Sequence, residues 1–226
     1  MKKTIGLWMV FALCTMAADF WKKPFMQWSD KAVTKMITDS PWAKSASVSM
    51  NFPGAPAMPP GGGFGGGAPG GPQGGGGGPD FTPPSFDVVA RWQTALPIRQ
   101  ALVRLKYGAE ADKSAEAQKV LAEQETSYEI VLSGPLGAFL RGTPEDSVKA
   151  LSEVTVLSSR RAGEIKPSQI EVGKPGRSMD VLFVFPRSMP FTVDDQEVEF
   201  STKLGASKVR YKFKLKDMVF DGKLEM

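Results

Sequence analysis

The chain has 226 residues, of which 42% are hydrophobic, and its formal net charge is +4 at neutral pH. This is enough apolar material for one folded domain with additional segments, and so small a positive excess does not indicate a nucleic-acid-binding protein. The chain contains no histidine and one cysteine. That composition excludes Ser–His–Asp and Cys–His catalysis and the usual zinc, copper and haem sites.

The first 17 residues have the organisation of a secretory signal peptide. Lys2 and Lys3 form a short cationic start, and an uncharged, largely apolar run follows from Thr4 to Met16. This run is shorter than the ~20 apolar residues that cross a bilayer. Thr15 and Ala17 are the small residues three and one positions before a cleavage point after Ala17. We therefore expect an exported protein, either periplasmic or secreted, whose signal peptide comprises residues 1–17.

Two other interpretations of this leader stay open. It could be retained as an uncleaved anchor, or the chain could be a lipoprotein cleaved before Cys14. The second conflicts with the large Leu13, because a lipoprotein signal has a small residue immediately before the cysteine. Cleavage after Ala17 removes Cys14, so the mature chain would have no cysteine and no disulfide.

Residues 18–52 predict an N-terminal amphipathic helix and a strand. Ser29 is a good N-cap, Asp30 suits the positive end of a helix, and Pro41 resists its continuation, so we expect a helix over Ser29–Asp39. Apolar residues then alternate with polar ones from Val48 to Phe52, which is typical of a half-buried strand.

Three tryptophans flank the predicted helix, namely Trp21, Trp28 and Trp42. One interpretation is that they cover the core of the main domain. The other is that they contact a membrane surface or a partner protein, where aromatic side chains are common.

Residues 53–85 are dominated by glycine and proline and include the run Gly74 to Gly78. Such a composition cannot bury enough apolar surface to order itself, so we expect a disordered linker or a very long loop. About 30 Gly-rich residues span about 30 Å, which can return the chain to the same sheet or tether a separate N-terminal module. No Walker lysine accompanies the glycines, so they do not predict a phosphate-binding loop.

The remaining residues, 86–226, predict an α+β main domain with a mixed or antiparallel sheet and two or three short helices. Its first half alternates between strand and helix patterns. We expect strands at Phe86–Trp92, Tyr128–Leu132, Val154–Ser158 and Ser168–Val172, and helices from Pro97 to Gly108, over Ala115–Glu123, and from Thr143 to about Leu151 or Ser152.

The C-terminal part is expected to be entirely β. Residues Val181–Phe185 are apolar on both faces, as in a central strand. A hairpin is predicted from Glu197–Lys203 and Lys208–Lys216 around Gly205. In its register, apolar side chains oppose each other on one face and opposite charges on the other. The expected pairs are Val198 with Phe213, Phe200 with Tyr211, Thr202 with Val209, Glu199 with Lys212, and Glu197 with Lys214.

The densest charge in the chain lies on one face of this hairpin's second strand, at Lys208, Arg210, Lys212, Lys214 and Lys216. These side chains could contact a polyanion such as anionic lipid or acidic glycan. Alternatively, they guard a sheet edge against aggregation and are partly neutralised by Glu197 and Glu199. Asp194 and Asp195 could add oxygen ligands for calcium, but their spacing is not that of an EF-hand and a turn is the simpler explanation.

Three segments resemble a family of uncharacterised exported bacterial proteins that carry a Ser-Pro-Trp-Ala motif near the N-terminus. They are the stretch from Trp28 to Ala43, which ends in Ser40-Pro41-Trp42-Ala43, the stretch Arg91–Leu102, and the stretch Lys212–Leu224. The resemblance implies no activity and no catalytic residues. It does imply that the N-terminal helix and the main domain form one unit.

We therefore expect an exported cell-envelope protein with a non-catalytic interaction or structural role. No catalytic, cofactor-binding or metal-binding residues are predicted. The partner would be another envelope protein or an anionic surface, and no nucleic acid is expected. The alternatives are a carboxylate-based hydrolase acting on envelope polymers, and a polyanion or membrane-surface binder that uses the lysine-rich strand.

Overall fold

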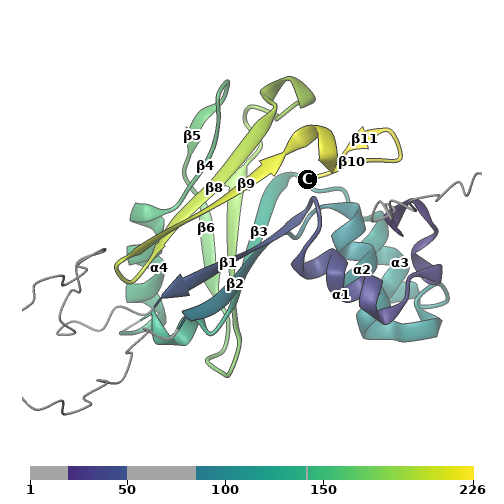
Figure 1. Cartoon of the computed structure of the whole chain (residues 1–226), viewed down its shortest axis with the longest axis horizontal. Coiled ribbons are helices and arrows are strands. Elements are labelled where there is room, and N and C mark those ends of the chain that lie inside the picture. The colour runs from purple at the N-terminus through teal and green to yellow at the C-terminus, as the bar shows by residue number, and fades with distance from the viewer. Residues whose placement is uncertain (1–19, 50–84, 141) are drawn as a thin grey trace, which may run out of the picture.

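A computed structural model describes residues 20–49, 85–140 and 142–226 (Figure 1). The expected signal peptide, nearly all of the expected linker and the last residues of the first predicted strand lie outside these ranges. Within the described residues, no helix is long and apolar enough to cross a membrane.

Two antiparallel sheets form the body of the protein. The five-stranded sheet has the order β1-β2-β3-β7-β6, and the four-stranded sheet has the order β5-β4-β8-β9. The bounds in the first are β1 (Ala43–Ser49), β2 (Ser85–Trp92), β3 (Ser127–Gly134), β6 (Gln169–Val172) and β7 (Met179–Pro186). Those in the second are β4 (Val156–Ser159), β5 (Gly163–Ile165), β8 (Glu197–Leu204) and β9 (Ser207–Lys214). A small pair, β10 (Val219–Phe220) and β11 (Lys223–Leu224), follows.

The two sheets pack face to face as a sandwich, and their inner side chains form the core. Alternate residues point inward, because successive side chains on a strand project to opposite faces. Trp92 of β2 meets Phe213 of β9 with ring centroids 5.7 Å apart, and Phe183 of β7 meets Phe200 of β8 at 5.3 Å. These four aromatic side chains are fully buried.

Helices close the two ends of the sandwich (Figure 1). The helices α1 (Asp30–Thr38), α2 (Leu96–Tyr107) and α3 (Ala115–Ala122) lie together at one end, and α4 (Pro144–Val154) lies at the other. Ser29 caps α1 by accepting a hydrogen bond from the backbone of Ala32, as expected of an N-cap. The 3-10 helices are Phe20–Lys22, Phe25–Gln27, Gly108–Glu110, Leu136–Ala138, Val193–Asp195 and Leu215–Met218.

The N-terminal segment belongs to the same folded unit as the rest of the chain. β1 pairs with β2 along its whole length, so Ser49 lies opposite Ser85, and α1 packs against α2. The Gly/Pro-rich segment therefore joins two neighbouring strands of one sheet and does not tether a separate module.

The fold class is confirmed: the protein is α+β, with four helices and antiparallel sheets in the described part, and its C-terminal region is all strand. The hairpin register is also confirmed in every predicted pair, and Gly205 adopts a positive φ of 58° in its turn. Several boundaries differ. The first strand was predicted from Val48 but begins at Ala43, and β5 was not predicted. Val154 ends α4 instead of starting a strand, and β9 ends at Lys214, because Leu215 and Met218 turn into the core as a 3-10 helix.

Candidate interaction surfaces

Four cations stand in a row on the outward face of β9. Lys208, Arg210, Lys212 and Lys214, here called the basic row, are all exposed, whereas Val209, Tyr211 and Phe213 between them are buried. Lys216 was expected to continue the row, but it lies in the 3-10 helix that follows the strand.

Only the middle of the basic row is neutralised by ion pairs within the described residues. The Lys212 Nζ atom lies 2.9 Å from Glu197 Oε1 and 3.8 Å from Glu199 Oε2, and Arg210 Nε lies 3.8 Å from Glu199 Oε1. The hydrogen bond to Glu197 raises the pKa of Lys212. Lys214 faces Glu197 in the strand register, but the ion pair is formed diagonally with Lys212. The two ends of the row, Lys208 and Lys214, are therefore left with unneutralised charge.

The position of β9 also fits the interpretation that its lysines guard a sheet edge against aggregation, because that interpretation requires an edge strand. β9 is an edge strand of the four-stranded sheet, and β1, an edge strand of the other sheet, lies beside it. The Tyr211 hydroxyl donates a buried 2.8 Å hydrogen bond to the Val88 main-chain oxygen, which links the two sheets on this side. Lysines on such an edge oppose pairing with another strand.

The outward face of the five-stranded sheet is acidic. The strand register places four carboxylates on it, one each from β2, β3, β6 and β7: Asp87, Glu129, Glu171 and Asp180. The only cation that the strands place on this face is Arg91, whose Nη2 atom lies 3.1 Å from Asp180 Oδ2. We call the surface that carries these four carboxylates the acidic face. The sequence did not predict this face, because polar residues alternate along β6 but the middle of β7, Val181–Phe185, is apolar on both faces.

Apolar side chains occupy the middle of the acidic face. Val89, Leu182 and Val184 are half-buried. Val131 is only 6% exposed, although its side chain points away from the sandwich core.

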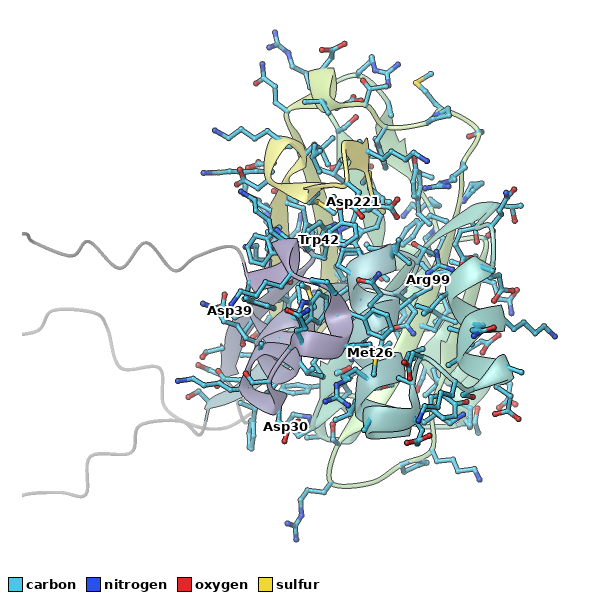
Figure 2. All side chains as sticks on the ribbon, turned by 90° about the vertical axis from the view of Figure 1, so that its right-hand side faces the viewer. Met26, Asp30, Asp39, Trp42, Arg99 and Asp221 are labelled. Atoms are coloured by element: carbon cyan, nitrogen blue, oxygen red, sulfur yellow. The ribbon has the colours of Figure 1, made fainter. Side chains whose placement is uncertain are left out.

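A pocket of about 250 Å³ opens between α2, α3 and the start of β3. Arg99 on α2, labelled in Figure 2, is one of the residues that line this pocket, and its side chain is 11% exposed. Its Nη1 atom donates to the main-chain oxygens of Val120 at 2.9 Å and Glu123 at 2.7 Å, and contacts Glu125 Oε1 at 3.4 Å. Arg99 therefore ties the C-terminal end of α3 to α2.

Two glutamates of this pocket have different surroundings. Burial raises the pKa of Glu125, and Arg99 partly opposes that rise. Burial also raises the pKa of Glu129, and the nearby carboxylates of Glu125, Glu123 and Glu171 raise it further. The Glu129 carboxylate has no hydrogen bond or ion pair within the described ranges. Such a group can hold a proton at a higher pH than an ordinary glutamate, or accept a cation.

The three tryptophans lie against the core. Trp28 is 3% exposed and donates to the Lys23 main-chain oxygen at 2.9 Å; Trp42 is fully buried. Trp21 is half-buried and stands edge-on to Trp42, with ring centroids 5.8 Å apart. Of the three, only Trp21 presents part of its ring to the exterior.

Of the two aspartates considered for calcium, Asp194 is exposed and Asp195 is engaged by the protein itself. Asp195 is buried and accepts hydrogen bonds from the side chains of Arg161 and Ser159 and from the backbone of Thr192. Burial alone would raise the pKa of Asp195, but these donors outweigh it and lower the pKa to about 2. In the part of the chain that the structure describes, no cluster of three or more acidic or cysteine side chains could hold a metal ion.

No family model matches this chain, and neither a curated protein nor a solved structure matches it. The resemblance to the exported Ser-Pro-Trp-Ala proteins therefore stays a prediction, and the inferences below rest on the chain's own residues.

Proposed function

We propose that this is an exported cell-envelope protein that acts as a non-catalytic interaction module. The leader in residues 1–17 supports export. The surface supports the interaction role, since the charge of the sandwich is concentrated on two outward sheet faces and not in a deep cleft.

One observation carries this proposal: the two outward faces of the sandwich have opposite charge. The basic row stands on the four-stranded sheet, and the acidic face belongs to the five-stranded sheet. Charge arranged in this way favours encounter with complementary surfaces and sets orientation. Three further acids have structural partners. Glu197 and Glu199 pair with cations of β9, and Asp195 holds Arg161.

The test is a broad hydrolase screen with the purified protein on glycan, peptide and ester substrates of the envelope. We expect no turnover above a buffer control. Turnover that is abolished by Glu129→Gln, but kept by Glu164→Gln on the opposite sheet, would show that the protein is an enzyme.

A carboxylate-based hydrolase is the second candidate, because the pocket holds Glu125 and Glu129 in unlike environments. The pKa of both glutamates is raised by burial, but only that of Glu125 is partly held down by Arg99. Two carboxyl groups in unlike environments are the usual acid–base arrangement of such enzymes. In this case activity would fall at high pH as Glu129 loses its proton, and Glu125→Gln would also be inactive.

A polyanion or membrane-surface binder is the third candidate, favoured by the unneutralised ends of the basic row. Co-sedimentation with vesicles containing anionic lipid, or with acidic glycan, tests it directly. Binding that is unchanged in the Lys212→Glu, Lys214→Glu double variant would remove this candidate.

A further inference from the structure

We propose that the acidic face of one copy binds the basic row of a second copy, so that the protein associates head to tail. This inference rests on the proposed non-catalytic interaction role and names its partner. The two surfaces belong to the same chain, which means that every copy carries both halves of the contact.

The charge balance of the two faces carries the argument. On the outward face of the five-stranded sheet, four carboxylates and Arg91 give a net charge of −3. On the outward face of the four-stranded sheet, the basic row and Lys203 supply five cations against three acids, a net charge of +2. Those three acids are Glu164, Glu197 and Glu199. Each face repels its own kind and attracts the other.

The surroundings of Glu129 point the same way. The charged neighbours that raise the pKa of Glu129 are the carboxylates of Glu125, Glu123 and Glu171, and Glu129 forms no ion pair within the described residues. At the other face, Lys203 and Lys208 lie directly opposite each other in the hairpin register, a like-charge pair that is itself unfavourable. A second copy would relieve both repulsions with one contact.

The geometry decides the kind of assembly. The inner faces of the sandwich are packed together, so its two outer faces point in opposite directions. A contact between unlike faces cannot be a two-fold dimer contact, because it uses the acidic face of one copy and the basic row of the other. The first copy then still has a free basic row, and the second a free acidic face. Such heterologous contacts continue into an open chain unless the rotation between copies closes a ring.

The area limits the strength of the contact. Five strands spaced about 4.8 Å apart and at most eight residues long give a face of at most about 20 Å by 25 Å, or about 500 Å². Stable complexes bury about 800 Å² on each partner. The half-buried Val89, Leu182 and Val184 can be covered by the aliphatic stems of lysines, which adds some hydrophobic burial. We expect a dissociation constant of about 0.1 mM, and association that weakens with salt, since screening acts over about 10 Å at 0.1 M and about 3 Å at 1 M.

Charge reversal on each face tests the proposal. The first variant carries Asp87→Lys and Glu171→Lys, and the second carries Lys208→Glu and Lys214→Glu. Asp180, Arg210 and Lys212 are left in place because they form the ion pairs described above. A control variant carries Lys119→Glu and Lys223→Glu, in α3 and β11 and so on neither outer face. Circular dichroism and thermal unfolding verify that each variant is folded.

Sedimentation velocity of the purified protein at about 0.1 mM in low salt is the measurement. We expect the wild-type and control proteins to show a weight-average sedimentation coefficient that rises with concentration and falls to the monomer value in 0.5 M salt. Each reversed variant alone should stay monomeric, because its two faces then have the same sign. An equimolar mixture of the two reversed variants should associate again, because unlike faces are restored between alternate copies.

Several results would overturn the inference. They are a wild-type protein that stays monomeric at low salt, a mixture that does not recover association, or association that survives in both variants. A monomeric wild-type protein whose binding to anionic vesicles is lost with Lys208→Glu and Lys214→Glu would assign the basic row to a polyanion. None of these results bears on turnover, so they are distinct from a failure of the non-catalytic role.

Discussion

The indole nitrogen of Trp42 donates a 2.9 Å hydrogen bond to the main-chain oxygen of Glu225, 183 positions further along the chain. Figure 2 shows Trp42 where the purple N-terminal segment meets the yellow C-terminal one. The Glu225 carboxylate accepts from the backbone of Leu96 at the start of α2, and Arg187 donates to the Met226 main-chain oxygen at 3.1 Å. The last residues of the sequence thus hold the helical end of the molecule against the sandwich.

We expect Trp42→Ala to lower the free energy of unfolding by about 3–5 kcal/mol, because it removes a fully buried aromatic side chain and leaves a cavity. Trp42→Phe should cost less, about 1–2 kcal/mol, since it mainly leaves the Glu225 oxygen without its donor. Urea unfolding monitored by circular dichroism measures both. Trp21→Phe is the matched control, and a loss as large as that of Trp42→Phe would contradict this account.

The Asp195–Arg161 pair predicts a loss of stability in acid. The pKa of Asp195 is lowered from 3.8 to about 2 in the folded protein, so the carboxylate stabilises the fold above pH 3.8 and this contribution disappears as the pH falls towards 2. The lowering of the pKa from 3.8 to about 2 corresponds to at most about 2.5 kcal/mol. Asp195→Asn should remove this part of the pH dependence between pH 4 and 2. An unchanged slope in the variant would show that other groups cause it.

For Glu129 we expect the opposite dependence of stability on pH. Its pKa is raised above 4.5 in the folded state, so folding favours the protonated form and stability falls as the pH rises through the folded pKa. Glu129→Gln should therefore stabilise the protein at pH 7 and have no such effect below pH 4.5. Thermal unfolding at the two pH values, compared with Glu164→Gln on the other sheet, is the measurement; destabilisation at pH 7 would mean that the carboxylate has a partner.

Gly205 is needed because of its backbone conformation, and not because a larger side chain would clash with its neighbours. Its φ is 58°, and a Cβ atom there would meet nothing closer than 3.8 Å. Gly205→Ala should therefore cost about 1 kcal/mol from the left-handed conformation alone. Ala206→Gly in the same turn serves as the control. A cost above about 3 kcal/mol for Gly205→Ala would indicate a steric clash that the structure does not contain.

The leader predicts a defined mature N-terminus. Mass spectrometry of the protein from an envelope or culture-supernatant fraction should find Ala18 as the first residue. Ala17→Leu should block cleavage and cause the precursor to accumulate, because the position before the cut requires a small side chain. Recovery of the intact chain from the cytosol, with Met1 or Lys2 at its start, would contradict export.

The sequence by itself determined the elements whose signals are local. The N-cap at Ser29, the start of α4 at Thr143 and the register of the β8–β9 hairpin each depend on residues within a few positions of one another, and all were predictable. Tertiary structure alone decided how the strands divide between two sheets, because pairing of distant strands leaves no local pattern. It therefore also decided that Glu129 and Glu171 share one face, that the basic row stands on the other, and that Trp42 lies in the core, since each of these depends on chain segments brought together only by folding.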